Sequence, residues 1–213
     1  MASFNEMESD SNGLSHLCFV VDETLISRFL LLLQRGFLIK AHIGCSVRRF
    51  LLEEIGLNSD AIEKIQSVIL NGKPVDDLDS AIIRDGSSLA LSAAVPGLVG
   101  ATLRRGGRYS SFRSTITYEE TGAQCFSGEG FVRMKLFNLL LDSLGRDFLK
   151  KGIYLSAADF KDFLAEQSSD FWQGCRDVFL NGKAAGLRAL ENIVRLPLSA
   201  RLMLSVNVPH GDF

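Results

Sequence analysis

The sequence predicts an α+β protein that contains two tandem copies of one small domain. The main observation is an internal repeat, in which VILNGK at residues 68–73 returns as VFLNGK at residues 178–183. Two further pairs of similar segments occur in the same order, residues 50–54 with 163–167 and residues 89–96 with 202–209. Because chance similarity rarely keeps its order over such a distance, these pairs indicate a tandem duplication.

Length and composition fit this organisation. The chain has 213 residues, which is enough for two domains of roughly 100 residues each. Hydrophobic residues make up 46% and charged residues 23%, as is typical of a folded protein with apolar cores. The net charge of −2 argues against a general binder of nucleic acid or of an anionic membrane.

The sequence gives no sign of membrane insertion or secretion. Its most apolar run, residues 29–33, is short and is bracketed by Arg28 and Arg35, so we predict no membrane span. The N-terminus is polar and acidic, unlike a secretory signal or a basic transit peptide. We therefore predict a cytoplasmic protein with a disordered tail at residues 1–12.

Residue types that carry metal-dependent or nucleophilic chemistry do not cluster in the sequence. The cysteines form no CxxC pair, and they are Cys18, Cys45, Cys125 and Cys175. Carboxylate pairs such as Glu53 and Glu54 have no His or Ser partner that would complete a catalytic site. The sequence thus predicts no catalytic residue, no metal site and no cofactor, and hence a protein that is not an enzyme.

The first copy is predicted over residues 13–99. Its expected elements are strands at 14–21, 37–43, 67–70, 73–75 and 89–95 and helices at 25–35 and 47–55. Acidic, cap-like residues precede the first helix and Gly36 ends it, while Ser46 is a typical N-cap for the second helix. Asn71–Gly72 is a strong signal for a tight turn between two strands.

The second copy is predicted over residues 130–213 and follows the same plan. Its expected elements are strands at 131–137, 153–155, 177–180 and 201–208, a helix at 139–150 and a second helix that ends at Leu164. Gly152 stops the first of these helices, and either Ser156 or Asp159 caps the second. Asn181–Gly182 repeats the turn of the first copy.

The inter-repeat segment, residues 100–129, is dense in Gly, Ser, Thr and Arg and is too long for an ordinary linker. Residues 111–118 have strand character, so the segment either packs on a domain as an added strand or stays mobile. Its composition offers few core anchors, and we expect it to be the most protease-sensitive interior region.

A family resemblance rests on four segments: VRMKLF at 132–137 ahead of a leucine-rich helix, NGK at 181–183, LMLSVNV at 202–208 and RDGSSL at 84–89. They resemble parts of the small subunit of molybdopterin synthase and of the thiazole-biosynthesis sulfur carrier. These carriers have the β-grasp, or ubiquitin-like, fold, in which a helix crosses a mixed sheet whose two terminal strands are neighbours at its centre. The resemblance therefore implies two tandem β-grasp domains.

The resemblance also implies a chemistry at a C-terminal Gly-Gly. An activating enzyme of the family adenylates that carboxylate, and sulfur then replaces the AMP to give a thiocarboxylate. In this chain Gly106 and Gly107 are followed by Arg108, and Gly211 is followed by Asp212, so neither tail can act without proteolysis.

We accordingly expect a non-catalytic binding or adaptor protein derived from sulfur-carrier-like domains. Its partner would be a protein, such as an adenylating enzyme or a larger synthase subunit. The alternative is a sulfur carrier or ubiquitin-like modifier that is activated at a terminal glycine after proteolytic maturation.

Two groups of residues are candidates for partner binding. Arg104, Arg105 and Arg108 lie beside aromatic residues and could contact an RNA backbone, dock on an acidic face, or remain a solvated loop. Phe171 and Trp172 fall outside the periodic apolar pattern and could form an exposed partner site. The slightly negative net charge favours a protein over a nucleic acid.

Overall fold

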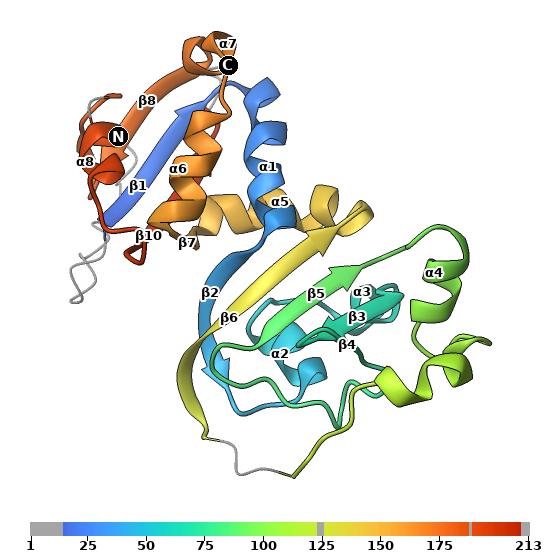
Figure 1. The fold of residues 1–213 in the computed structure, drawn as a ribbon. Helices are drawn as coiled ribbons and strands as arrows, with labels where there is room; N and C mark the ends of the chain where they lie inside the picture. Colours follow the sequence, from blue (N-terminus) through green and yellow to red (C-terminus); the bar gives the residue numbers. More distant parts are fainter. Residues whose placement is uncertain (1–14, 123–125, 188, 210–213) are drawn as a thin grey trace. The chain divides into compact units, whose positions relative to one another are not determined.

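A computed structural model describes residues 15–122, 126–187 and 189–209, and the chain divides into two compact units (Figure 1). Unit 1 combines Met1–Leu32 with Arg146–Phe213, and unit 2 is Leu33–Gly145. Both units combine helices with mixed β-sheet, so the coarse prediction of an α+β protein is confirmed. The predicted tail at 1–12 and the candidate glycine Gly211 lie outside the described residues.

Unit 2 has a mixed sheet with strand order β4-β3-β5-β6-β2. Its strands are β2 (Phe37–Ile43), β3 (Ser67–Leu70), β4 (Lys73–Pro74), β5 (Ser88–Ser92) and β6 (Gly128–Phe137). Its helices are α2 (Val47–Glu53), α3 (Ser59–Glu63), α4 (Gly97–Leu103), the 3-10 helix η2 (Ser110–Ile116) and the start of α5 (Leu139–Lys151). The central strands β5 and β6 run parallel, whereas their outer neighbours β3 and β2 run antiparallel to them.

The core of unit 2 lies on one face of this sheet. Burial alternates along β6, where Val132, Met134 and Leu136 are buried and the residues between them are half-buried, as the period of a strand requires. Helices α2 and α3 lie behind this face (Figure 1), and their Phe50 and Ile62 are fully buried. The opposite face of the sheet is therefore the more open one.

Unit 1 has a mixed sheet with strand order β7-β10-β1-β8-β9. Its strands are β1 (Ser15–Val21), β7 (Ile153–Ser156), β8 (Cys175–Leu180), β9 (Lys183–Ala184) and β10 (Arg201–Asn207). Its helices are η1 (Glu23–Leu25), α1 (Ile26–Arg35), the end of α5, α6 (Ala157–Ala165), α7 (Ser169–Gln173) and α8 (Ala189–Val194). The central strands β1 and β10 are again parallel.

Capping follows the sequence signals. The Ser46 side chain accepts a hydrogen bond from the Arg49 backbone N–H at the start of α2. At the start of α6 the cap is Ser156, whose Oγ accepts from the Asp159 N–H at 3.0 Å, so the choice left open by the sequence is settled. Gly152 ends α5 with a φ of 100°, a conformation that suits glycine.

The two compact units group the strands differently from the predicted domains, residues 13–99 and 130–213. In unit 2 the neighbour of β5 is β6, which belongs to the second repeat. In unit 1 the neighbour of β8 is β1, which belongs to the first repeat. Each unit therefore takes a central strand from the other half of the chain, because either apolar strand can fill a central position.

The two Asn-Gly turns have the same geometry. Asn71 and Asn181 both have a φ of 51°, and Gly72 and Gly182 have φ values of 79° and 76°. Both positions of each turn therefore have positive φ, as expected for this type of hairpin turn.

The asparagine side chain of each turn also accepts a backbone hydrogen bond from a neighbouring strand. Asn71 Oδ1 accepts from the Ser88 N–H at 2.8 Å, and Asn181 Oδ1 accepts from the His16 N–H at 2.8 Å. Strand β5, which carries Ser88, thus has its structural counterpart in β1, which carries His16, rather than in β10.

This geometry predicts a stability cost at Gly182. A β-carbon there meets open space, so Gly182→Val should act through the backbone conformation alone and lower the free energy of unfolding by about 1–2 kcal/mol. Urea denaturation measures the change, with Lys183→Val at the adjacent exposed strand position as the matched control. An unchanged midpoint for Gly182→Val would contradict the positive-φ turn.

Candidate functional site

The inter-repeat segment belongs to unit 2, and the structure describes its residues 100–122 and 126–129. Residues 97–103 form α4 and residues 110–116 form η2, so the strand character predicted for residues 111–118 is replaced by a 3-10 helix. Helix α4 packs closely on the loop before it, because a β-carbon at Gly100 would lie 1.6 Å from the Val95 carbonyl oxygen. The segment therefore adds no strand at residues 111–118, and α4 and η2 give it regular structure.

A buried arginine fixes this segment to unit 2. Arg113 is only 4% exposed, and its guanidinium forms two hydrogen bonds to the Asp76 carboxylate, at 2.7 and 3.1 Å. Its Nε also donates to the Thr102 carbonyl oxygen, and its Nη1 donates to Thr117 Oγ1. The ion pair thus joins α4, η2 and the loop that carries Asp76, with most of the guanidinium donors satisfied.

Backbone and side-chain bonds secure the turn between α4 and η2. The Arg105 N–H donates to the Gln66 carbonyl oxygen at 2.7 Å, and the Arg105 guanidinium pairs with Glu63 at 3.2 Å. The Gly106 N–H donates to Asp76 Oδ1 at 3.1 Å, and the Gly107 N–H donates back to Arg104. The predicted carrier tail is therefore an internal turn in this structure.

A second ion pair holds the end of the segment. Arg84 pairs with Glu120 at 2.6 Å, and the Tyr118 hydroxyl donates to Glu120 at 2.8 Å. The Arg84 hydrogen bonds hold the pKa of Glu120 at about 2, while they raise the pKa of Arg84. Burial raises the pKa of Tyr118. The Glu120 carboxylate thus stays ionised and paired with Arg84 over the whole physiological pH range.

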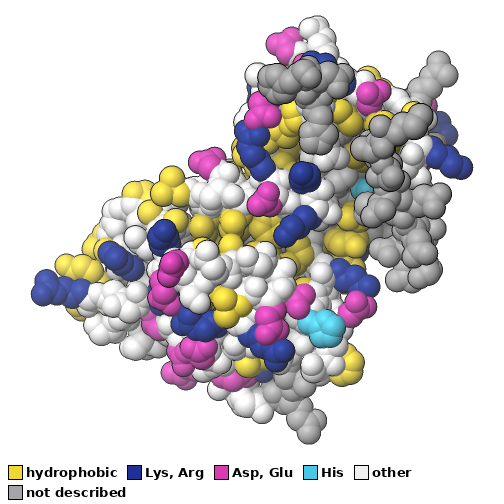
Figure 2. All heavy atoms as spheres, turned by 180° about the vertical axis from the view of Figure 1, so that it is seen from behind, with side chains coloured by type: hydrophobic (Ala, Val, Ile, Leu, Met, Phe, Trp, Pro, Cys, Tyr) yellow, Lys and Arg dark blue, Asp and Glu magenta, His cyan; other side chains and the backbone are white. Residues whose placement is uncertain are grey.

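The anchored segment exposes apolar side chains to solvent. Phe112 is 80% exposed, Leu98 75% and Val99 64%, and Ile116 and Tyr109 are exposed as well. We call these five residues, together with the exposed Arg104 and Arg108, the α4–η2 surface. Tyr109 and Phe112 stack with their ring centroids 6.0 Å apart. Figure 2 shows hydrophobic and basic side chains together at the left, where α4 lies.

The predicted partner-binding residues divide between the surface and the interior. Arg104 and Arg108 lie on the α4–η2 surface, whereas Arg105 is engaged by Glu63. Phe171 is 2% exposed and packs in the aromatic core of unit 1, 5.5 Å from Phe29 between ring centroids.

Phe171 is therefore a core residue, and Trp172 packs edge-on against it at 5.0 Å. The aromatic core consists of Phe19, Phe29, Phe160, Phe163 and Phe171. The sequence did not assign the exposed Leu98 and Val99 of α4 or Ile116 of η2 to a site, because neither helix has an amphipathic pattern.

Two nucleophilic groups of unit 1, the Ser205 hydroxyl and the Cys175 thiol, lie in settings that disfavour reaction with a substrate. His16 Nε2 lies 2.9 Å from Ser205 Oγ, but Ser205 is 5% exposed and so is poorly accessible to a substrate. Burial, with a smaller contribution from Asp22, raises the pKa of the Cys175 thiol to about 11, which disfavours the reactive thiolate.

Within the ranges that the structure describes, no three His, Cys, Asp or Glu side chains come together as a metal site. In the same ranges, no helix is long and apolar enough to cross a membrane. No protein family, curated protein or solved structure matches this chain.

The Glu120 ion pair predicts a pH dependence of stability. Because the pKa of Glu120 is lowered from 4.5 to about 2 in the folded protein, its stabilisation is complete above the unfolded pKa and is lost as the pH falls towards 2. Glu120→Gln removes this titration, so the variant should lose less free energy of unfolding than the native chain between about pH 5 and pH 2.5.

Urea denaturation at several pH values measures this difference, and Glu119→Gln is the matched control because Glu119 is exposed. The control should keep the pH dependence of the native chain. Parallel pH profiles for the native chain and Glu120→Gln would show that the Arg84–Glu120 pair does not stabilise the fold.

Proposed function

We propose that this chain is a non-catalytic binding or adaptor protein that docks a protein partner through the α4–η2 surface. The observation that carries the proposal is the exposure of Leu98, Val99 and Phe112 on a segment that buried polar contacts hold in place. The proposal extends the expectation drawn from the sequence, and it assigns the docking role to one surface of unit 2.

The anchoring of the segment supports a binding role. A segment that merely joined two parts of the chain would not need an ion pair with an almost fully buried arginine, since desolvating the Arg113 guanidinium costs free energy. Holding Phe112 and its neighbours in a fixed arrangement lowers the entropy lost on association. Clustered, exposed apolar side chains on a rigid support are typical of protein–protein interfaces.

The charge of the segment indicates the kind of partner. Residues 97–118 contain arginines and no Asp or Glu, and Arg104 and Arg108 are exposed. A complementary partner would present an apolar groove bordered by carboxylates. We propose a cytoplasmic protein for this role, with an adenylating enzyme or a larger synthase subunit as the first candidates.

Strand order supports the proposed β-grasp ancestry. In a β-grasp sheet the first and last strands are parallel neighbours at the centre. The order β4-β3-β5-β6-β2 of unit 2 has this arrangement if β6 corresponds to the first strand and β5 to the last. We propose that the two repeats arose by duplication and that each unit now includes a strand from the other repeat.

The carrier alternative requires cleavage after Gly107 or after Gly211. Because Gly106 and Gly107 both donate backbone hydrogen bonds within the turn, a protease would first have to open that turn. The intact mass of the protein from its own cells distinguishes the two functions. A full-length mass agrees with the binding protein, whereas a product that ends at Gly107 or at Gly211 would favour the carrier.

The docking surface predicts a selective loss of binding. The full-length chain is purified, together with its cross-linked partners, from the cells that make it, and it should enrich a partner protein. The Leu98→Ser/Phe112→Ser variant should recover at least about tenfold less of that protein, as expected when central interface residues are changed. Leu198→Ser is the matched control, since Leu198 is 64% exposed but lies in unit 1. It should retain the partner.

Equal enrichment by the native chain and by Leu98→Ser/Phe112→Ser would contradict the assignment of this surface. Absence of any enriched protein would contradict the adaptor function itself.

A further inference from the structure

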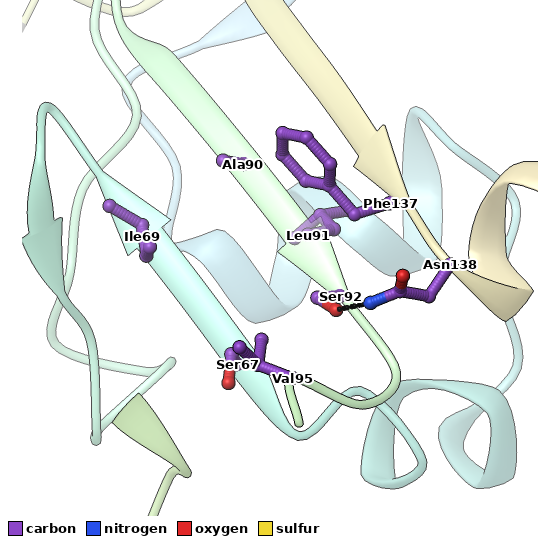
Figure 3. A pocket seen from close by; sticks show the side chains of 8 residues that line it. All are labelled: Ser67, Ile69, Ala90, Leu91, Ser92, Val95, Phe137 and Asn138. Atoms are coloured by element: carbon purple, nitrogen blue, oxygen red, sulfur yellow. Dashed lines mark hydrogen bonds between the residues drawn. The ribbon is translucent and has the colours of Figure 1, made fainter. Parts of the chain in front are cut away.

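A pocket lies on the open face of the unit 2 sheet, opposite α2 and α3 (Figure 3). Its volume is about 230 Å³, and it is lined by Ser67, Ile69, Ala90, Leu91, Ser92, Val95, Phe137 and Asn138. It lies at the carboxyl ends of the parallel strands β5 and β6, the end of a parallel pair where ligands commonly bind in open sheets.

The walls of the pocket are mainly apolar. Ile69, Ala90 and Phe137 come from three neighbouring strands and project from the same face of the sheet (Figure 3). Val95 closes one side, and it is held against α4 by the close approach at Gly100. An enclosed cavity of about 150 Å³ accommodates benzene, so this pocket has room for a slightly larger ring system.

Asn138 supplies a polar group with a fixed orientation. Its backbone has a φ of 55°, and its Nδ2 donates to Ser92 Oγ at 3.0 Å and to the Ala94 carbonyl oxygen. Ser92 Oγ in turn donates to Ala94 at 3.0 Å. The amide nitrogen is thus occupied, which leaves the Asn138 Oδ1 to accept a hydrogen bond from a bound molecule.

Ser67 supplies a second polar group. Ser67 is 2% exposed, and of the side chains that the structure describes, its Oγ is the one buried oxygen or nitrogen without a hydrogen-bond partner. Leaving such a buried group unpaired costs free energy, and in native proteins it usually has an explanation. Rotation about its Cα–Cβ bond turns the hydroxyl towards the pocket that Ser67 lines.

We infer that this pocket binds a small, neutral, planar molecule with an apolar ring and adjacent hydrogen-bond donor and acceptor groups. The ring lies against Ile69, Ala90 and Phe137. Its donor bonds to Asn138 Oδ1, and its acceptor receives the Ser67 hydroxyl. This small-molecule site is independent of the α4–η2 surface and of the partner that docks there.

The test uses indolin-2-one, whose lactam carries both groups, and indene, which has a similar shape and neither group. Titration of the full-length chain followed by ¹H–¹⁵N spectra should give saturable shifts at Ser67, Ala90 and Asn138. Indolin-2-one should bind about tenfold more tightly than indene, as expected for hydrogen bonds made inside an apolar pocket.

Two variants test separately the space inside the pocket and its two polar groups. Ala90→Phe fills the pocket and should abolish the shifts with both compounds. Ser67→Ala/Asn138→Gly should remove the preference for indolin-2-one while indene binding is unchanged, which also shows that this variant is folded. Glycine at 138 keeps the positive φ accessible.

Equal affinity of the native chain for the two compounds would overturn the inference. So would the lack of saturable shifts, or shifts that persist in Ala90→Phe.

Discussion

The fold of the segment that carries α4 and η2 depends on the ion pair between Arg113 and Asp76. The guanidinium is almost completely buried, and it bonds at once to a carboxylate, to two backbone carbonyl oxygens and to a hydroxyl. Removing the guanidinium would break its bonds to Asp76 and to the Thr102 and Arg104 carbonyl oxygens, and we expect this to free both α4 and η2. The apolar residues of the α4–η2 surface keep their arrangement because this pair keeps the segment folded.

The parallel pairing of the central strands constrains both units. Parallel neighbours cannot be joined by a tight turn, so a parallel strand pair needs a long connection or a strand from elsewhere in the chain. In this chain β6 pairs with β5 and β1 pairs with β10. The long segment between β5 and β6 serves as that connection in unit 2, which explains why it carries structure of its own.

The sequence predicted the local structure well, because local signals determine it. The Ser46 cap and the positive φ of Gly72 and Gly182 follow from residue type alone. It did not predict which strands pair, since β1 and β6 have equally apolar patterns and either can fill a central position. Nor did it predict the burial of Arg113, because an arginine in a Gly- and Ser-rich segment is usually solvated and its partner Asp76 lies far away in the sequence.

The most direct test is amide hydrogen exchange at Arg105 and Tyr118, whose N–H groups bond to Gln66 and Pro74 outside the segment. In the native chain we predict protection of at least about 100-fold over an unstructured peptide. Arg113→Ala should abolish it and leave β5 protected, whereas the exposed Arg108→Ala should not change it. Exchange of these two amides at the unstructured rate in the native chain would contradict the account.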